Sequence, residues 1–516
     1  MTNQKKEINK IPIILVMVII FALCITLVMN PVEAGNAIAE FKTSITKILS
    51  PFYLWLGVAV VAYLAYFSFS KYGNIRFGGE KPEYRTFSWI VMMFCAGMGS
   101  SMMYWAALEW IYYYSAPPMG AEPFSKMAAE LSMVYGNFHW SITAWAMFAV
   151  GAVALAQRYY IRKKPGLSLT ACVDNIIGEK AAKGTVGKII EIIFVFGILG
   201  GHATTLAFGV PMLCDNFSVL TGIPVSFTMQ VIMMLLVTLI FIASSWVGLE
   251  KGLKNLSDYN AYIAIALALF VLVAGPTMFQ IKSITNSLGY MFQNYLHMSL
   301  WTDYVGNSGF PEAWTSFYWA WWLGLGPWMW VFTTRISKGR TMREMILGMV
   351  ICGSLGCWLY FGTVSSFGLY QQLNGHLDLI NVMKTLGPDR AVSSLVLSLP
   401  LGKIVLAVWF IVGIVFLATT MDSSSYTLAA ATTKNLQAGE DPDRMFKMFW
   451  SFLLIAIPLA FMFAKASLTA LQSLAVLTAV PIAFLAILSM ISGYKYAKED
   501  FGDLTAKEIT EKTSKL

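Results

Sequence analysis

Aromatic side chains crowd one short segment of this chain, between residues 314 and 330. Its sequence is WTSFYWAWWLGLGPWMW. If the segment is a helix, side chains three or four residues apart share a face. One face then carries Tyr318, Trp321, Trp322, Leu325 and Met329, while Trp319 and Trp330 lie on another. A helix that is aromatic on nearly all sides exceeds what ordinary core packing requires.

Rings of this kind can hold a methylated ammonium group. Ring faces carry partial negative charge and a trimethylammonium nitrogen donates no hydrogen bond, so each desolvated cation–π contact contributes about 2 kcal/mol. Further rings stand elsewhere in the chain, namely Trp140, Trp145 and Tyr112 to Tyr114. For any single ring, packing is the simpler interpretation, and an interface belt of tryptophans accounts for Trp314 equally well. For the whole set, a cage is favoured.

The elements that must position these rings are membrane spans. The chain is 57% hydrophobic and 12% charged, with a mean hydropathy of +0.63, whereas soluble domains carry about 25% charged residues. Apolar runs of at least about 18 residues indicate transmembrane helices, so we expect an all-α integral membrane protein. Twelve spans are predicted, at residues 11–30, 50–69, 88–114, 136–159, 188–215, 225–245, 257–280, 310–334, 344–371, 401–433, 446–466 and 472–494.

The net charge of +8 is explained by membrane topology. If both termini are cytoplasmic, 28 of the 36 lysines and arginines fall in cytoplasmic segments, as the positive-inside rule requires. No nucleic-acid partner is therefore needed, and we expect a multi-pass protein of the cell inner membrane, surrounded by lipid. The first apolar run exceeds the about 7–15 residues of a signal-peptide core. None of the six cysteines forms a CxxC pair, so neither a disulfide framework nor a metal site is indicated.

Two predicted spans contain helix-breaking residues near their middles. The third has Gly97-Met98-Gly99-Ser100-Ser101 and the eighth has Gly324-Leu325-Gly326-Pro327. Interrupted helices at matching places in two halves point to a transporter's central binding site, although glycine also simply permits close helix packing. We therefore divide the chain into an N-terminal segment with two extra spans (1–87), a five-helix repeat (88–280), an amphipathic connecting helix (281–309), a second five-helix repeat (310–494) and a short tail (495–516).

Five motifs carry a resemblance to a known family. They are GMGSS at 97–101, FHWSITAWA at 138–146, FYWAWW at 317–322, TRISKGRTMRE at 334–344 and ATTMDSSSYT at 418–427. Together they resemble the betaine/carnitine/choline transporter family, in the same order and over nearly the whole chain. The resemblance implies two inverted five-helix repeats of the leucine-transporter type, a homotrimer, and secondary transport of a small quaternary-ammonium compound.

The resemblance also assigns substrate-site residues. The family's central cage corresponds here to Tyr112, Trp140, Trp145, Trp321 and Trp322, while a cage position that is usually aromatic is Leu325. Trp314 matches a second substrate site on the outer side in carnitine transporters of the family. No Arg or Lys lies in the cage, so backbone amides at the broken third span, around Met98 and Gly99, are candidates for binding a substrate carboxylate. We expect a zwitterion such as glycine betaine or carnitine, with choline as the alternative.

The resemblance leaves the coupling open. In the family's sodium symporters, one sodium site uses carbonyls of the broken third span and hydroxyls of the tenth, which correspond to Cys95, Met98, Phe416, Thr419 and Thr420. The simpler interpretation of the two threonines is that they bond back to their own helix. Sodium-independent exchangers resemble this chain at Met329, whose thioether replaces another sodium, but they carry an arginine where this chain has Asn260. We expect sodium symport, with carnitine/butyrobetaine-type exchange as the alternative and no further cofactor.

Ionisable residues inside predicted spans are candidates for function. Asp422 follows the two threonines closely and is expected to support the ion site or cap a helix. Glu109 and Glu191 are expected near span ends, solvated or paired. His139 and His202 are expected to be hydrogen-bonded in the core, with proton carriage as the alternative.

Other functions fit the residues less well. An amine or amino-acid carrier would need oxygen acceptors rather than ring faces. A membrane enzyme is not expected, because the sequence has no nucleophile–base constellation, metal-ligand spacing or phosphate loop. Osmotic regulation is not expected either, because osmosensing members of the family carry long charged extensions and the tail here is short, with balanced charge.

Overall fold

The computed structural model of the chain describes residues 7–79, 81–437, 440–463 and 468–516, and this part is almost entirely helical. The first half contains α1 (Lys10–Met29), α2 (Pro31–Phe69), α3 (Thr86–Gly97), α4 (Gly99–Ser115), α5 (Lys126–His139), α6 (Ile142–Ala156), α7 (Asp174–Ile177), α8 (Glu179–Lys183), α9 (Thr185–Thr221), α10 (Phe227–Val247) and α11 (Lys254–Ala274). The second half contains α12 (Thr277–Leu300), α13 (Phe317–Ile336), α14 (Met342–Leu347), α15 (Gly353–Tyr360), α16 (Ser366–Leu373), α17 (Leu379–Leu386), α18 (Pro388–Leu397), α19 (Gly402–Ala431), α20 (Arg444–Phe463), α21 (Leu468–Phe501) and α22 (Ala506–Ser514).

Many of these helices are long enough to cross a membrane. Among the described residues, eight helices have the length and apolar character of a span, and the bent pair α3–α4 makes up to nine. The all-α membrane class is therefore confirmed, while the count of twelve and the inverted repeats stay predictions. The other predicted spans correspond to α1, α13 and α20. The eleventh, at 446–466, runs partly outside the described residues, as does the start of the N-terminal segment, residues 1–6.

The predicted break in the third span is confirmed. α3 and α4 meet at Met98 and are bent by 63° relative to each other. Met98 leaves helical geometry, with φ of −131° and ψ of −19°. Glycines flank it on both sides, and their low helix propensity favours an interruption there. A second interruption was not predicted: α5 ends at His139 and α6 begins at Ile142, so the fourth span is broken at Trp140 and Ser141.

The predicted break in the eighth span is wrong. α13 is continuous from Phe317 to Ile336 with Pro327 inside it. Proline removes one backbone hydrogen bond, but close packing against α6 holds the helix together across this point. The indole N–H of Trp330 donates to the carbonyl of Met147 at 2.8 Å, and a Cβ on Gly326 would lie 3.2 Å from the same carbonyl. The glycines thus serve close helix packing, the alternative that the sequence had left open.

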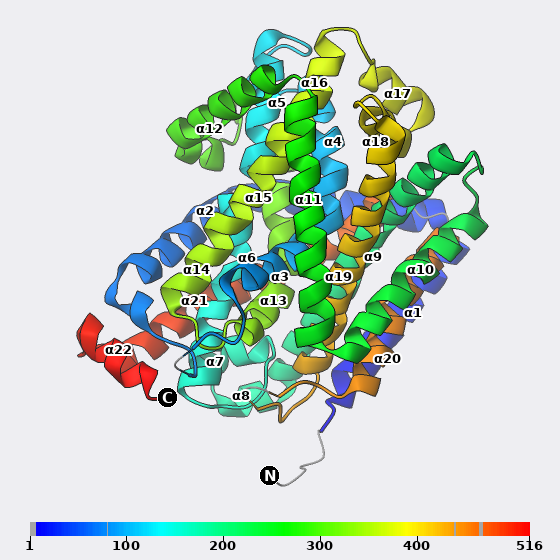
Figure 1. The fold of residues 1–516 in the computed structure, drawn as a ribbon. Helices are drawn as coiled ribbons and strands as arrows, with labels where there is room; N and C mark the ends of the chain where they lie inside the picture. Colours follow the sequence, from blue (N-terminus) through cyan, green and yellow to red (C-terminus); the bar gives the residue numbers. More distant parts are fainter. Residues whose placement is uncertain (1–6, 80, 438–439, 464–467) are drawn as a thin grey trace.

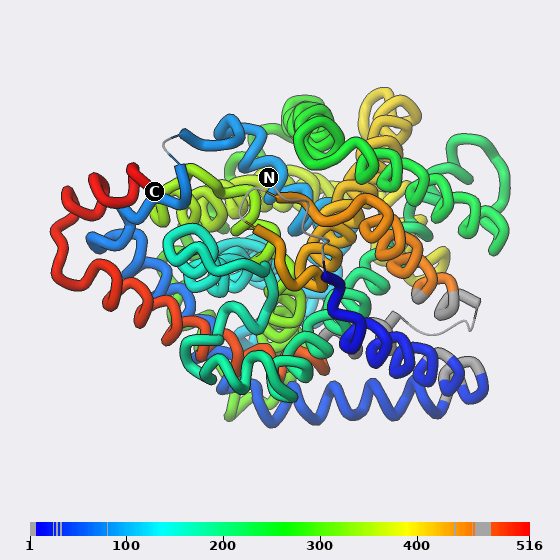
Figure 2. Tube along the Cα trace, turned by 90° about the horizontal axis from the view of Figure 1, so that it is seen from below, coloured from blue at the N-terminus to red at the C-terminus, as the bar shows by residue number. Residues whose placement is uncertain are grey.

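The helices form one bundle with distinct ends (Figure 1). The start of α1 and the last helix, α22, lie at one end of the bundle, here called the termini face, whereas α16, α17 and the start of α18 lie at the opposite end, here called the distal face. α13 lies at the centre, packed against α6 and α21, and α9 packs against both α19 and α21. α1 and α2 run along one side (Figure 2). α13 is buried along nearly its whole length, so the aromatic segment is a core element.

The predicted connection at 281–309 contains α12, which is helical from Thr277 to Leu300 and ends before residue 309. α12 packs against α5, with Met291 and Met298 buried and Phe292 and Leu296 exposed. α12 also packs against α2 and α16, so it contacts elements of both halves, and its role as a brace between them stays a prediction. In Figure 1 it lies obliquely at the upper left, beside the distal end of the bundle.

Candidate functional site

Three aromatic rings at the break between α5 and α6 form the centre of the site. Trp140 meets Trp322 edge to face, with ring centroids 5.0 Å apart, and Tyr318 stacks on Trp322 at 5.6 Å. Trp322 and Tyr318 share one face of α13 because they are four residues apart. Each of the three side chains is at most 3% exposed. We call Trp140, Tyr318 and Trp322 the ring cluster.

A buried carboxylate holds the ring cluster from one side. Glu109, on α4, is fully buried and accepts hydrogen bonds from the indole N–H of Trp140 at 2.7 Å and the hydroxyl of Tyr318 at 2.6 Å. The hydroxyl of Tyr113, one turn along α4, donates to its other oxygen. Three donors satisfy a carboxylate that would otherwise be costly to bury. From the sequence, Glu109 was expected near a span end, and its contact with the ring cluster was not predicted. The feature that could have indicated this contact is a single acidic residue within an aromatic helix.

His139 extends the polar network behind the ring cluster. Its Nδ1 lies 2.8 Å from the hydroxyl of Tyr113 and its Nε2 lies 3.0 Å from that of Thr315. Its carbonyl accepts the indole N–H of Trp322 at 3.0 Å. Because both ring nitrogens have partners, the structure fits the expected core role of this histidine.

Two other predicted cage tryptophans stand apart from the ring cluster. Trp145 stacks on Phe94 at 5.8 Å and reaches the cluster through Phe148, whose ring lies 5.9 Å from Trp145 and 5.5 Å from Trp322. Trp321 packs against Phe317 at 6.0 Å. With 8% of its surface exposed, Trp321 is the least buried of the four cage tryptophans.

The remaining cage positions on α13 pack against neighbouring helices. Leu325 lies against α9, where a Cβ on Gly201 would come within 2.2 Å of its side chain. Met329, one turn further along, is fully buried. The close approach of α9 at Gly201 therefore takes up the space beside the smaller leucine side chain.

Tyr112 contacts a second group of rings, which adjoins the ring cluster because Trp314 stacks on Tyr318 at 6.3 Å. Its ring lies 5.7 Å from Trp314 and 6.2 Å from Trp105. All three side chains are partly exposed, unlike those of the ring cluster. Tyr112 was predicted in the central cage and Trp314 in an outer site, and the structure brings these two together. We call Trp105, Tyr112 and Trp314 the outer rings.

The residues predicted for a sodium site converge where α19 crosses the break between α3 and α4. The hydroxyl of Thr420 donates to the carbonyl of Cys95 at 3.0 Å. A Cβ on Gly99 would lie 3.1 Å from that hydroxyl and 3.3 Å from Phe416, so the backbone approaches closely there. Carbonyl and hydroxyl oxygens are the hard ligands that a sodium ion requires, so the donor set fits this ion.

Two further members of the predicted sodium set have other contacts. The hydroxyl of Thr419 donates back to the carbonyl of Phe416 at 3.0 Å, the local bond weighed from the sequence. The thioether of Met98 faces the thiol of Cys357 at 3.2 Å. The donated bond leaves the lone pairs of the Thr419 hydroxyl oxygen available to a cation, whereas the Met98 side chain has no oxygen to offer.

The other ionisable residues brace helices. Asp422 accepts from the hydroxyl of Ser244 at 2.5 Å, which ties α19 to α10. His202 has Nδ1 at 2.7 Å from the carbonyl of Ile198 and Nε2 at 2.6 Å from the hydroxyl of Ser424. Among the described residues, no group of three or more His, Cys, Asp or Glu side chains could hold a metal ion.

A charged network closes the termini face beneath the ring cluster. Arg335, at the end of α13, pairs with Glu83 at 3.0 Å and with Asp441 at 3.2 Å. The hydroxyl of Tyr426 on α19 donates to Asp441 at 2.9 Å. These bonds join the segment before α3, the end of α13 and the segment after α19.

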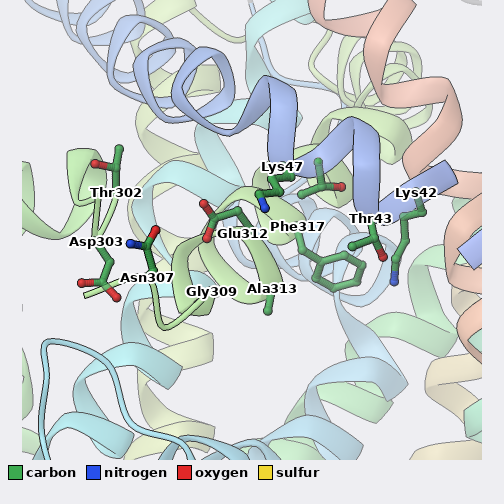
Figure 3. Close-up of a pocket in the computed structure, with 11 residues that line it drawn as sticks. Lys42, Thr43, Lys47, Thr302, Asp303, Asn307, Gly309, Glu312, Ala313 and Phe317 are labelled. Carbon is green, nitrogen blue, oxygen red and sulfur yellow. The ribbon is translucent and has the colours of Figure 1, made fainter. Parts of the chain in front are cut away.

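A surface cavity of about 410 Å³ lies away from the ring cluster. It opens between α2 and the segment 302–317, and Lys42 lies over the ring of Phe317 at 5.2 Å (Figure 3). Its walls carry both signs of charge, from Lys42 and Lys47 on one side and Asp303 and Glu312 on the other. This cavity holds none of the predicted cage residues.

The comparison with known protein families decides the assignment. The model described as "BCCT, betaine/carnitine/choline family transporter" matches residues 12–502. The chain belongs to this family. It is 40% identical over 454 residues to the uncharacterized transporter YeaV of Escherichia coli strain K12, covering 88% of this chain and 94% of that protein. It is 35% identical over 444 residues to a carnitine transporter of Acinetobacter baumannii, covering 86% of this chain and 80% of that protein.

Among solved structures, the chain is similar to a Na⁺-coupled sialic acid symporter in its substrate-bound outward-open state. The two share 12% identity and a TM-score of 0.44, over 93% of this chain and 96% of that one. A likeness this distant carries no conclusion about mechanism. BCCT-family proteins are transporters, so the prediction that the chain is a membrane transporter and not an enzyme is confirmed by the family.

Proposed function

We propose that this BCCT-family protein is a secondary transporter of a small quaternary-ammonium compound, with carnitine or glycine betaine as the substrate and choline as the alternative. The ring cluster is the observation that supports this most strongly. Glu109 takes up the polar edges of Trp140 and Tyr318, so a ligand that enters between the rings would meet their π faces, of which that of Tyr318 stacks on Trp322 in this structure. Those faces attract a cation that needs no hydrogen-bond acceptor.

The acidic partner of the ring cluster adds to the selection for a cation. A buried carboxylate at the edge of the rings contributes negative potential in a medium of low dielectric constant. A primary amine would need oxygen acceptors, and those of Glu109 already accept three donors. Methylated nitrogen is thus favoured over an amino group. The carnitine transporter of A. baumannii, 35% identical to this chain, points to the same substrate class.

For coupling, we propose sodium symport through the site where α19 meets the break between α3 and α4. Carbonyls of Cys95, Met98 and Phe416 and the hydroxyls of Thr419 and Thr420 would hold the ion. The bond from Thr420 to Cys95 joins α19 to α3 in this structure. An ion bound there would stabilise one packing of α19 against α3 and α4, and so one state of the transporter.

Exchange without sodium is the second candidate, and Met329 supports it, since its buried thioether matches the exchangers. Those exchangers carry an arginine at the position of Asn260, and this difference argues against exchange. Asn260 is buried on α11, and neither its oxygen nor its nitrogen has a hydrogen-bond partner among the described residues. An uncharged amide provides no fixed substitute for a cation.

We further propose that the protein lies in the cell inner membrane as a homotrimer, with the termini face towards the cytoplasm. The bias of lysine and arginine towards that side of the predicted topology supports the orientation. The deciding experiment for the function is uptake of labelled carnitine, glycine betaine and choline into proteoliposomes, with and without an inward sodium gradient. Uptake that rises several-fold with the gradient supports symport. Equal uptake that depends on substrate loaded inside supports exchange, and no uptake or binding of any of the three contradicts the proposal.

A further inference from the structure

Two carboxylates lie close together near the distal face, and only one of them is paired with a cation. Asp215, towards the end of α9, accepts from Nε of Arg390 at 2.9 Å and from the hydroxyl of Ser393 at 2.5 Å. Asp389 immediately precedes Arg390 at the start of α18. Its Oδ1 is buried and has no hydrogen-bond partner within the described part of the chain. Arg390 is committed to Asp215, so the charge of Asp389 is left uncompensated.

The surroundings of Asp389 are aromatic. α18 packs against α4 as well as α9, α17 and α19. From α4, the phenol groups of Tyr104 and Tyr112 interact electrostatically with the Asp389 carboxylate. Tyr112 is one of the outer rings, and the ring of Tyr104 lies 5.3 Å from that of Trp105, another of them. The uncompensated carboxylate therefore belongs to a helix packed on α4, which carries two of the partly exposed outer rings, and the third, Trp314, stacks on Tyr318 of the ring cluster at 6.3 Å.

The charge of Asp389 changes within the physiological pH range. Burial, together with the neighbouring Asp215, raises the pKa of Asp389 to about 7, because loss of water and a like charge both disfavour the ionised form. The other titratable groups facing it are Cys214 on α9 and the two tyrosines on α4. The lysines of the other two packed elements, Lys384 on α17 and Lys403 on α19, are exposed.

A purely local role does not explain this placement. An acid in the first turn is favoured by the helix dipole, but that interaction gives no reason for Oδ1 of Asp389 to be buried without a donor. A buried acceptor without a partner costs about 1–3 kcal/mol. A cation arriving from solvent would relieve the uncompensated charge, and rings beside it would contact the methyl groups of that cation.

We propose that Asp389 is a docking residue, which draws the methylated ammonium group of the substrate to the outer rings before the substrate moves to the ring cluster. This inference rests on the proposed function. A charge in a cleft of low dielectric constant raises the local concentration of an oppositely charged ligand. Asp389 acts on arrival of the substrate, so its loss affects KM and leaves kcat nearly unchanged.

The test compares wild type, Asp389→Asn and Asp389→Glu in proteoliposomes, with labelled carnitine as substrate and choline as competing cation. For wild type, KM for carnitine and the inhibition constant of choline fall as the pH rises from 6 to 8. The ionised fraction of a group with a pKa near 7 rises from about one tenth to about nine tenths over this range. At pH 8, Asp389→Asn raises the inhibition constant of choline about tenfold and the KM for carnitine several-fold. It abolishes the pH dependence of both constants and keeps kcat within twofold of wild type. Asp389→Glu restores the pH dependence.

The matched control is Glu122→Gln, which removes an exposed acid from the segment between α4 and α5 and leaves all of these constants unchanged. Tryptophan-fluorescence titration of the purified variants confirms that they are folded and still bind carnitine at high concentration. If wild type is active but its KM for carnitine and its inhibition constant for choline equal those of Asp389→Asn at pH 8, the docking role alone is overturned. A wild type that neither transports nor binds these compounds overturns the docking role together with the proposed function.

Discussion

The indole N–H of Trp140 donates a hydrogen bond to Oε2 of Glu109 at 2.7 Å, and both side chains are buried. This bond links the end of the broken fourth span to α4, which follows the break in the third. The two interruptions therefore meet through one carboxylate. A movement of either helix changes the position of the ring that stands against Trp322.

Replacing Glu109 should weaken substrate binding in a graded way. Glu109→Gln keeps the shape but loses the charge, and one hydrogen bond to a charged acceptor is worth about 1.5–3 kcal/mol. We expect the Kd for carnitine to rise about tenfold. Glu109→Ala leaves three buried donors without an acceptor, so the loss is larger and is accompanied by a lower Tm. Calorimetric titration measures the first effect, and equal Kd values for Glu109→Gln and wild type would contradict it.

Replacing Thr420 should separate sodium coupling from substrate binding. Thr420→Val is nearly isosteric but removes the hydroxyl that contacts the carbonyl of Cys95. We expect loss of most of the sodium stimulation of uptake, while Thr420→Ser, which keeps the hydroxyl, retains it. The measurement is the ratio of initial uptake rates with and without a sodium gradient. Wild-type stimulation in Thr420→Val would rule out this ion site.

Loosening the network around Arg335 should open the termini face. Glu83→Gln removes one of the two acids that pair with Arg335, and breaking a partly buried pair leaves its partner undercompensated. We expect amide hydrogen exchange in the segments 75–85 and 432–437 to rise several-fold. Lys338→Gln, on the same face, provides the control. If the exchange rates of Glu83→Gln equal those of wild type, the network does not close this face.

Packing between α6 and α13 should tolerate no added methyl group at Gly151. A Cβ there would come within 2.0 Å of the ring of Trp330. We expect Gly151→Ala to lower the Tm in detergent by several degrees or to prevent folding, as overpacking costs about 1–3 kcal/mol. Gly289→Ala on α12, where a Cβ meets nothing within 4 Å, should leave the Tm unchanged or raise it. Equal Tm values for both variants would contradict this packing.

The sequence predicted the elements of the site better than their connections. Apolar length identified the membrane helices, because a span must be apolar over its whole length. The break at Met98 followed from its flanking glycines. The glycines and Pro327 of α13 also predicted a helix break, but this prediction is wrong because tertiary packing against α6 keeps that helix intact. The interruption at Trp140 and Ser141 carried no glycine or proline to reveal it.

The spacing of residues along the sequence cannot predict which side chains on different helices contact one another. Helical periodicity placed Tyr318 and Trp322 on one face of α13, but Glu109 and Trp140 belong to other spans, and their bond to this face depends on how the helices dock. For the same reason, the ring contact of Tyr112 could not be predicted from spacing. It lies one turn or less from Glu109 along α4, yet its ring faces Trp314.

Binding of carnitine to purified single-ring variants tests the central claim most directly. Calorimetric titration compares wild type with Trp140→Ala, Trp322→Ala and a matched variant outside the ring cluster, Trp246→Ala, whose side chain is exposed on α10. We expect each cluster variant to raise the Kd at least tenfold, since a desolvated cation–π contact is worth about 2 kcal/mol, and Trp246→Ala to match wild type. Unchanged Kd values in folded Trp140→Ala and Trp322→Ala would contradict it.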